Sequence, residues 1–442
     1  MADVRYYDVR SVRGEVTQID IDNGVVESAG TSFFDKTVIR VLGPRGWGIL
    51  TRDHVDIDDR RELDGLVAAA ARLAAVTKDA ISLADAPRGV LAVPPLGEDP
   101  RDVDLEEKTR LLAGIEAAAR IEGVANTRAR YTEGIDAVRF RDSSENEYSF
   151  EAVRSGFSVL AIASKNGVMQ MGSERDHITT GFNLRDKQGL GRKAGEVAVS
   201  LLDAKLPKGG AQRAILDPEL AGVFTHEAVG HASEGDLVRE GASVLGGKIG
   251  EEIGCRGLVI VDDPSLHEFG FIPVDAEGVA VQRTEIIRDG ILRSFLHNRE
   301  TLAAVGDGIP GHARAEHGAP PIVRMSNTFI ENGDASYDEL LAECRDGILL
   351  IGSRGGQVDP GRGIFQFNAE YGYIVRGGET TDMVRDVSLS GEILSTLHNI
   401  TLIGDDRRMS PGYCGKGGQS VPVSDGAPHL LLEGAVIGGR GE

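Results

Sequence analysis

Cysteine is scarce in this chain, tryptophan occurs once, and long apolar runs are missing from its 442 residues. The three cysteines are too few and too far apart for a disulfide framework, so we expect a reducing, cytoplasmic compartment. No stretch of about 18 apolar residues occurs, which argues against a membrane span. The first residues carry no basic segment followed by an apolar run, so no signal peptide is expected.

Positive charge is also in short supply. Lysine and arginine total 48 against 69 aspartates and glutamates, which gives a formal net charge of −21. This acidic balance favours solubility and argues against a broad phosphate-binding surface, so neither nucleic acid nor a membrane is expected as a partner. The length predicts two or three domains with sizeable cores.

Residues 1–205 mix strands with helices and are expected to form an N-terminal mixed α/β domain. Apolar residues at helical spacing predict an amphipathic helix around 60–78. A second helix should open at Asp104, where Glu107 stands three residues on, as in a capping box. Strands are predicted at 18–22, 38–42 and 157–163.

Residues 206–442 have a different texture, in which short apolar runs alternate with glycine-containing turns. Asp289-Gly290 between two such runs predicts a hairpin with a type I′ turn. Similar turn signals occur at Asn332-Gly333, Ser390-Gly391 and Asp425-Gly426. We therefore expect an α+β protein whose C-terminal domain is β-rich, mainly antiparallel, and carries a short metal-binding helix.

The prediction of a metal-binding helix rests on one segment, His226-Glu227-Ala228-Val229-Gly230-His231. Zinc peptidase helices usually place their two histidines four apart, on one helix face. Here they are five apart, which turns the second imidazole about 140° away on a regular α-helix. A π-turn would realign them, as its hydrogen bonds join residues five apart. Alternatively, Gly230 would end the helix early.

If both histidines bind a metal, Glu227 would lie beside its water and act as general base. Glu234 or Asp236 would then be able to orient an imidazole. The alternatives are that the histidines stand near a glutamate by chance and that both carboxylates are simply solvated.

A catalytic zinc needs about three protein ligands, so a third must come from elsewhere. Cys414 lies in a segment, 410–419, that is rich in glycine and is expected to be a tight loop, where Lys416 would favour the thiolate. An isolated cysteine is more often a small buried apolar residue. Cys255 and Cys344 are weaker candidates, as are His297, His312, His317 and His398.

These segments together resemble the TldD/PmbA family of metallopeptidases. The histidine motif, followed by Glu234-Gly235-Asp236, resembles its metal-binding signature. The run 414–419 with Val421-Pro422-Val423 resembles its C-terminal signature, and 324–328 and 352–373 resemble blocks between the two. The resemblance covers most of residues 205–442 and is loose before them.

The resemblance implies that His226, His231 and Cys414 hold one zinc ion per chain and that Glu227 is catalytic. All four positions are present, as in the TldD-type chains. It further implies a zinc-dependent peptidase that hydrolyses unfolded or extended peptides. Such proteins form homodimers or heterodimers with a related chain that lacks the metal signature.

Two other classes of function stay open at this level. The chain would be a non-catalytic, zinc-containing assembly subunit if a further residue closed the metal site. Nucleotide binding is suggested by the glycine-rich segment 189–195 before an expected helix, although it lacks the ending of a P-loop. The group that would stabilise an oxyanion is also open, with Tyr413, Lys416 and His398 as candidates.

Overall fold

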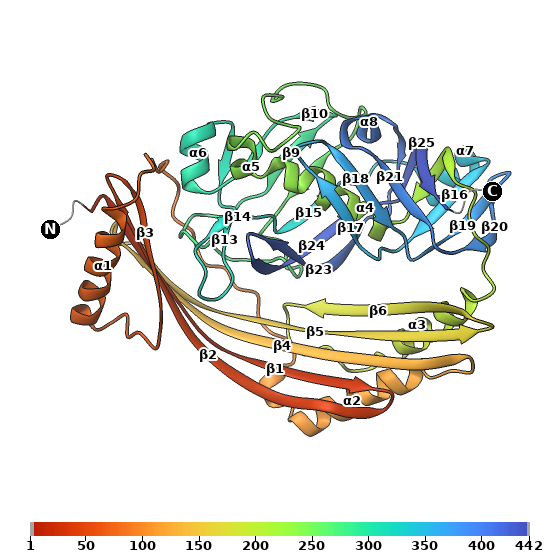
Figure 1. The fold of residues 1–442 in the computed structure, drawn as a ribbon, viewed down its shortest axis with the longest axis horizontal. Helices are drawn as coiled ribbons and strands as arrows, with labels where there is room; N and C mark the ends of the chain where they lie inside the picture. The colour runs from red at the N-terminus through yellow and green to blue at the C-terminus, as the bar shows by residue number, and fades with distance from the viewer. Residues whose placement is uncertain (1–3, 440–442) are drawn as a thin grey trace.

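The computed structural model describes residues 4–439, and its first half is built on one long, curved sheet (Figure 1). Six strands follow the order β3-β2-β1-β4-β5-β6 and every neighbouring pair is antiparallel. The strands are β1 (Tyr6–Asp22), β2 (Val25–Gly43), β3 (Gly46–Asp53), β4 (Val124–Asp142), β5 (Glu147–Lys165) and β6 (Val168–Ile178). All three predicted strands lie within longer elements of this sheet.

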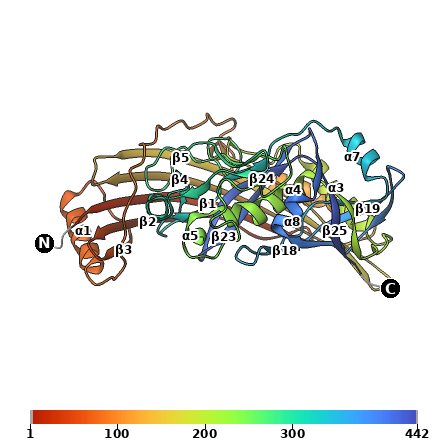
Figure 2. The same cartoon turned by 90° about the horizontal axis from the view of Figure 1, so that it is seen from above.

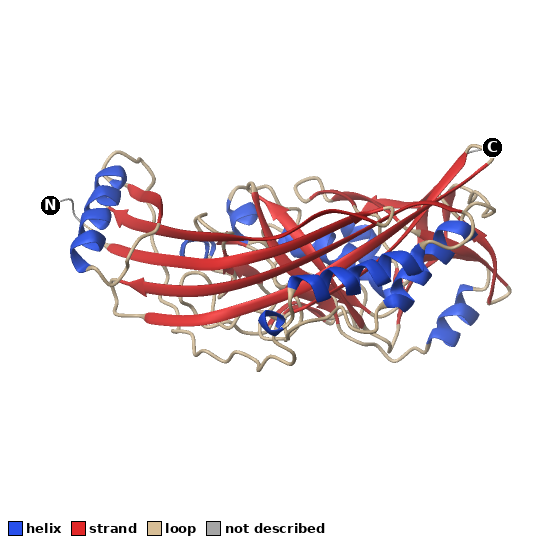
Figure 3. Cartoon of the chain, turned by 90° about the horizontal axis from the view of Figure 1, so that it is seen from below, coloured by secondary structure: helices blue, strands red, loops and turns tan. Residues whose placement is uncertain are grey.

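Helices cover the outer face of the sheet, away from the second half of the chain (Figure 3). They are α1 (Arg60–Ala74), α2 (Leu105–Ala119) and α3 (Gln188–Ser200), with a 3-10 turn, η1, at Pro100–Asp102. The predicted first helix is confirmed but ends at 74 instead of 78. The Asp104 cap is also confirmed, because its carboxylate accepts the Glu107 N–H at 2.7 Å. Only half of a capping box forms, since the Glu107 carboxylate binds Arg185.

The second half of the chain lies on the concave side of the long sheet, and α1 stands beyond it at the far end (Figures 1 and 2). One mixed sheet follows the order β10-β9-β8-β15-β24-β23. Its strands are β8 (Ile260–Asp262), β9 (Thr284–Arg288), β10 (Ile291–Leu292), β15 (Asn327–Ile330), β23 (Arg408–Lys416) and β24 (Gln419–Ala427).

A second sheet has nine strands, in the order β17-β18-β21-β25-β7-β16-β19-β20, with β22 also paired to β25. Its strands are β7 (Gly210–Leu216), β16 (Gly347–Ile351), β17 (Gly356–Asp359), β18 (Ile364–Asn368), β19 (Tyr371–Arg376), β20 (Glu379–Val384), β21 (Ser388–Glu392), β22 (Ile400–Ile403) and β25 (Leu430–Gly438). In the two large sheets only β15–β24 and β7–β16 are parallel pairs. Short two-stranded pairs join β11 (Phe295–His297) to β12 (Gly308–Pro310) and β13 (Ala313–Arg314) to β14 (Ile322–Val323).

One hydrophobic core joins these two sheets, and the helix that leads into the histidine motif runs through it. Leu220 and Phe224 of that helix, α4 (Pro218–Phe224), are fully buried and pack with Ile260 of one sheet and with Leu216 and Phe365 of the other. The remaining helices of this half are short: α5 (Gly235–Arg239), α6 (Arg299–Val305), α7 (Tyr337–Cys344) and α8 (Ile393–His398). No helix among residues 4–439 is long and apolar enough to cross a membrane.

Glycine has two different uses in this half. The predicted hairpin is confirmed, because Asp289 and Gly290 have φ of 51° and 75° between β9 and β10. Two of the other three turn predictions are wrong, and the third marks a loop between β15 and α7 instead of a tight turn. Ser390-Gly391 and Asp425-Gly426 lie inside β21 and β24, and Asn332-Gly333 lies in a loop without positive φ. A Cβ on Gly426 would lie 2.9 Å from the Arg408 carbonyl oxygen, so this glycine permits close packing within a strand.

The segment 189–195 forms no loop, so its interpretation as a phosphate-binding loop is wrong. It lies inside α3, which begins at Gln188. A Cβ on Gly191 would lie 2.0 Å from the Ile115 carbonyl oxygen, and one on Gly195 would lie 2.5 Å from that of Ala119. The glycines therefore let α3 pack closely against α2.

Gly191→Ala should destabilise the protein by about 1–3 kcal/mol, because the added methyl group would push α3 away from α2. Urea unfolding measures this change. Gly189→Ala in the same helix is the matched control, because no atom lies within 4 Å of its Cβ position. The control should be neutral or stabilising by up to about 1 kcal/mol. Equal free energies of unfolding for the two variants would contradict this account of the packing.

Candidate metal centre

The histidine motif follows a short, well-capped helix, α4 (Pro218–Phe224). Asp217 caps it by accepting the Leu220 N–H at 2.9 Å, and Pro218 occupies the first helical position. The chain then widens into one π-helical turn, η2 (Thr225–Gly230), and tightens into a 3-10 turn, η3 (His231–Ser233). The His231 N–H donates to the His226 carbonyl five residues back. Of the two irregularities considered, a π-turn and an early helix end at Gly230, the structure therefore has the π-turn.

Packing against the mixed sheet accounts for the glycine in this turn. A Cβ on Gly230 would lie 1.9 Å from the sulfur of Met325, so no larger residue fits without displacing that side chain. Eight residues earlier, a Cβ on Gly222 would lie 2.9 Å from the backbone nitrogen of Gly426 in β24. Both glycines allow the helix to approach the sheet that carries Cys414.

The π-turn brings the two histidines to one cysteine across the fold. The ligand-type atoms of His226, His231 and Cys414 all lie within 4.8 Å of one another. The Cys414 Sγ is 3.4 Å from the His231 Nε2, and the two imidazole rings are nearly perpendicular, with centroids 5.3 Å apart. Cys414 lies on strand β23 and not in a loop, which corrects the prediction. Only Gly417 and Gly418 form the turn that follows.

The chemistry of these three groups fits a zinc ion. Zinc–nitrogen and zinc–sulfur bonds of about 2.0–2.3 Å in a tetrahedron place ligand atoms roughly 3.5 Å apart. His226 Nδ1 is buried without a hydrogen-bond partner among the described residues. Burial alone would raise the pKa of Cys414, but His226 and His231 outweigh it and lower that pKa to about 4. The cysteine is therefore a thiolate, the form that binds metal.

Glu227 lies beside this cluster without belonging to it. Its Oε2 is 3.8 Å from His231 Nε2, the same nitrogen that faces Cys414. Its side chain is 31% exposed, whereas the three clustered side chains are largely buried. Glu227 therefore stands where solvent reaches the cluster.

Glu234 orients the second histidine, so the simpler view of a solvated carboxylate does not hold for it. This fully buried residue places its Oε2 3.0 Å from His231 Nδ1. Lys416 Nζ lies 3.0 Å from the same oxygen and 2.7 Å from each Asp236 oxygen. Burial opposes ionisation of Glu234, but His231 and Lys416 prevail and lower its pKa. The ionised carboxylate fixes the His231 tautomer and ring orientation.

Lys416 acts differently from the prediction. Its ammonium group forms ion pairs with Glu234 and Asp236 and donates a hydrogen bond to the Val323 carbonyl oxygen. The cysteine thiolate is instead stabilised by the two histidines. A role for Lys416 at an oxyanion finds no support in these contacts.

The other histidines of the sequence analysis lie outside the cluster. His297 contacts Thr301, His312 contacts Thr284, His317 contacts Asp136, and His398 is exposed at the end of α8. Tyr413, beside Cys414, contacts His177 and Phe269.

Sequence reasoning missed one residue of the supporting shell, Arg324. It is fully buried and donates a hydrogen bond to the Cys414 carbonyl oxygen. Its sequence context could have indicated this role, because the charged residue follows Ile322-Val323 and precedes Met325, which are all apolar. A charged residue at such a position is rarely buried without a specific partner.

Three buried protein donors with a glutamate at the open side are the arrangement that catalytic zinc sites use. Sequence profiles of the PmbA/TldA metallopeptidases match three regions: domain 1 at residues 7–76, the central domain at 98–202 and the C-terminal domain at 209–439. The chain therefore belongs to the PmbA/TldA metallopeptidase family.

Individual relatives agree with this assignment. A metalloprotease of Archaeoglobus fulgidus is 39% identical over 99% of this chain and 100% of its own length. A zinc metalloprotease TldD homolog of Saccharolobus solfataricus is 33% identical over 70% of each chain. Among solved structures, TldE from Thermococcus kodakarensis has the same fold, with a TM-score of 0.79 and 18% identity over 99% of this chain and 97% of that one.

Glu234→Gln should weaken zinc binding about 10–100-fold, because the neutral amide holds His231 Nδ1–H less strongly and leaves Lys416 without one counter-charge. Competition with a chromogenic chelator measures the affinity. Glu240→Gln is the control, since Glu240 is exposed on the same segment and forms no ion pair among the described residues. Equal zinc affinities in both variants would show that Glu234 does not position the histidine.

Proposed function

We propose that this chain is a zinc-dependent peptidase that hydrolyses unfolded or extended peptides. The observation that carries the proposal is the convergence of the donor atoms of His226, His231 and Cys414 within 4.8 Å, with Glu227 at their open side. In this proposal the three residues are the protein ligands of one zinc ion and Glu227 is the catalytic base. A cytoplasmic compartment suits the reduced thiolate that the site requires.

Each residue has a distinct part in the reaction. Zinc in this site would lower the pKa of a water molecule and polarise the substrate carbonyl. Glu227 accepts the proton of the attacking water on a carboxylate oxygen and later donates it to the leaving amine. Glu234 accepts the Nδ1–H of His231 and so directs Nε2 toward Cys414, where this nitrogen would bind zinc once its proton is released. The buried surroundings of the histidines restrict the access of water to the side where Glu227 lies.

The substrate class follows from the edge on which Cys414 lies. Strand β23 is an end strand of its sheet, paired only with β24 in the sheet order. An extended peptide adds to such an edge through main-chain hydrogen bonds, which gives loose sequence preference. Unfolded segments meet this requirement, whereas most main-chain groups of a folded protein are already paired in its own secondary structure. This geometry supports peptides as substrates.

Glu227→Ala should keep its zinc and lose peptidase activity by about 10²–10⁴-fold, because the base is removed but the ligands are not. Cys414→Ser should lose zinc and activity together. Zinc content by atomic absorption and hydrolysis of an unstructured fluorogenic peptide are measured on the same samples. Glu240→Ala and Cys255→Ser are the matched controls outside the cluster and should behave as wild type.

Three outcomes would overturn parts of this proposal. Full activity of zinc-loaded Glu227→Ala would remove Glu227 as base. Zinc-containing wild type without hydrolysis would favour the non-catalytic assembly subunit. Metal-free wild-type protein that is still active would exclude zinc chemistry altogether.

We also propose that the chain works as a homodimer or with a related chain that lacks the metal signature. Strand β2 supports an assembly, because residues 25–33 are exposed along an edge that β3 covers only from Lys36 onward. Val25, Val26 and Phe33 are 58%, 45% and 76% exposed there. Light scattering of the purified chain should give about twice its 47.0 kDa mass, or a heterodimer once the partner is added. A fully active monomer would contradict both forms of assembly.

A further inference from the structure

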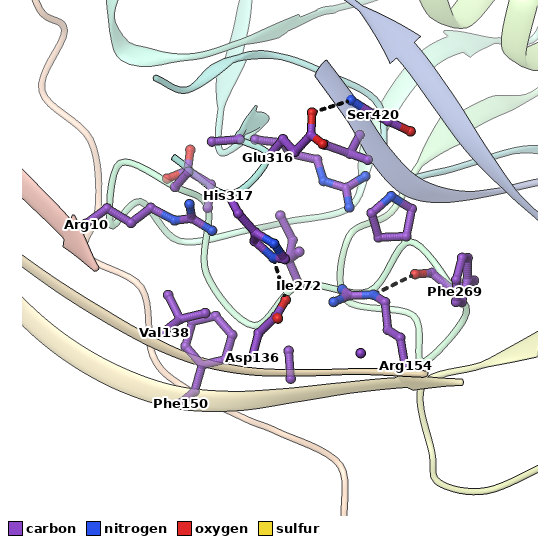
Figure 4. A pocket seen from close by; sticks show the side chains of 18 of the residues that line it. Arg10, Asp136, Val138, Phe150, Arg154, Phe269, Ile272, Glu316, His317 and Ser420 are labelled. Atoms are coloured by element: carbon purple, nitrogen blue, oxygen red, sulfur yellow. Dashed lines mark hydrogen bonds and ion pairs between the residues drawn. The ribbon is translucent and has the colours of Figure 1, made fainter. Parts of the chain in front are cut away.

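A cavity of about 310 Å³ lies between the long sheet and the β23–β24 hairpin (Figure 4). Three arginines from different parts of the chain line it: Arg10 on β1, Arg154 on β5 and Arg314 on β13. In Figure 4 the side chains of Arg10 and Arg154 enter from opposite sides, with His317 and Asp136 between them. Neither the three clustered metal-site residues nor Glu227 lines this cavity.

The three guanidinium groups keep hydrogen-bond donors free. Among residues 4–439 none of them has a carboxylate oxygen within 4.0 Å. Arg10 Nη1 is buried without a partner. Arg154 donates through Nε and Nη2 to the carbonyls of Phe269 and Phe271. Arg314, only 5% exposed, donates through Nη1 to the Met325 carbonyl. A buried arginine without an acidic partner is costly, which indicates a place for an anion.

The acidic groups of the cavity do not cancel this charge. Asp136 is held by His317 at 2.8 Å, and Glu316 accepts the Ser420 N–H at 3.0 Å. Burial and the neighbouring Glu277 raise the pKa of Asp275 to about 8. Burial, followed by the charges of Arg154 and Arg324, lowers the pKa of Arg314 to about 9. With Asp275 largely protonated at neutral pH, the three guanidinium groups are matched by only two carboxylates, those of Asp136 and Glu316, although the whole chain is strongly acidic.

Much of the remaining cavity wall is apolar. It includes Val138, Phe150, Phe269, Ile272, Val274 and Pro422. A volume near 300 Å³ is at the small end of ligand sites. Such a space suits one apolar side chain together with a small anion.

We propose that this cavity binds the free C-terminal carboxylate of a peptide whose last residue is apolar. The proposal rests on the peptidase function, because it names the end of the substrate that the protein recognises. Guanidinium groups match a carboxylate through paired N–H donors, and the apolar wall accepts the side chain. The free donors of Arg10, Arg154 and Arg314 provide the contacts.

The cavity is connected to the metal centre through strand β23. Tyr413 lines the cavity and the next residue, Cys414, belongs to the metal cluster. Arg324 binds the Cys414 carbonyl oxygen and also lies near Arg314. A peptide along β23 with its last residue in the cavity therefore extends past the strand that carries the metal ligand.

Calorimetry in the Glu227→Gln background, where turnover is removed, tests the binding directly. N-acetyl-leucine should bind and N-acetyl-leucinamide should not. Arg10→Gln should weaken binding of the acid about ten- to hundredfold, and Arg10→Lys should weaken it less, because it keeps the charge. Arg13→Gln is the matched control, since Arg13 lies on the same strand but pairs with Asp35 at 2.9 Å.

Three results would overturn the inference: equal binding of the acid and the amide, no effect of Arg10→Gln, or competition by acetate and phosphate as strong as by N-acetyl-leucine. The last result would mean an adventitious ion only. Circular dichroism of the Arg10 variants checks that they fold.

Hydrolysis separates this inference from the proposed function. A peptide ending in free leucine should have a KM about ten- to hundredfold lower than its amidated form, with similar kcat, and Arg10→Gln should abolish the difference. Binding of N-acetyl-leucine without any hydrolysis overturns the peptidase proposal alone. Hydrolysis that is indifferent to the C-terminus, without binding of the acid, overturns the carboxylate site alone.

Discussion

The spacing of His226 and His231 is the constraint on which the candidate centre depends. Five residues apart, the two imidazoles diverge on an α-helix, and only a wider turn directs them to one point. The chain supplies that turn in the middle of a core shared by two sheets, where Gly222 and Gly230 allow the backbone to lie against β24 and Met325. The irregular turn is thereby held by packing on several sides.

A chain of ion pairs connects the second histidine to charged residues around the site. His231 is held by Glu234, and Glu234 shares Lys416 with Asp236. Because Glu234 is fully buried, its charge is favourable only while both cationic neighbours are present. Lys416 and Cys414 both lie on β23. This one strand therefore positions Cys414, the third candidate ligand, and the lysine that pairs with Glu234 beside His231, the second candidate ligand.

Tyr413 of β23 lines the cavity that contains the three arginines. The chain as a whole has a net charge of −21, yet three arginines meet in one cavity between the long sheet and the hairpin. They come from β1, β5 and β13, which are far apart in sequence. The concave sheet therefore does more than support the second half, because it contributes two of the three guanidinium groups.

The sequence by itself determined the local features. The Asp104 cap and the Asp289-Gly290 hairpin each depend on residues a few positions apart, and both were predicted correctly. The histidine spacing likewise predicted a local irregularity, which the structure shows to be a π-turn. The glycines at 191 and 426 were misread as loop and turn signals, because a glycine that permits close packing looks the same in sequence as one that permits positive φ. Only the tertiary structure brought Cys414 to the histidines, gave Lys416 its carboxylate partners and gathered the arginines of the cavity. These contacts join residues up to about three hundred positions apart, and the pairing of strands that creates them leaves no periodic signal in the sequence.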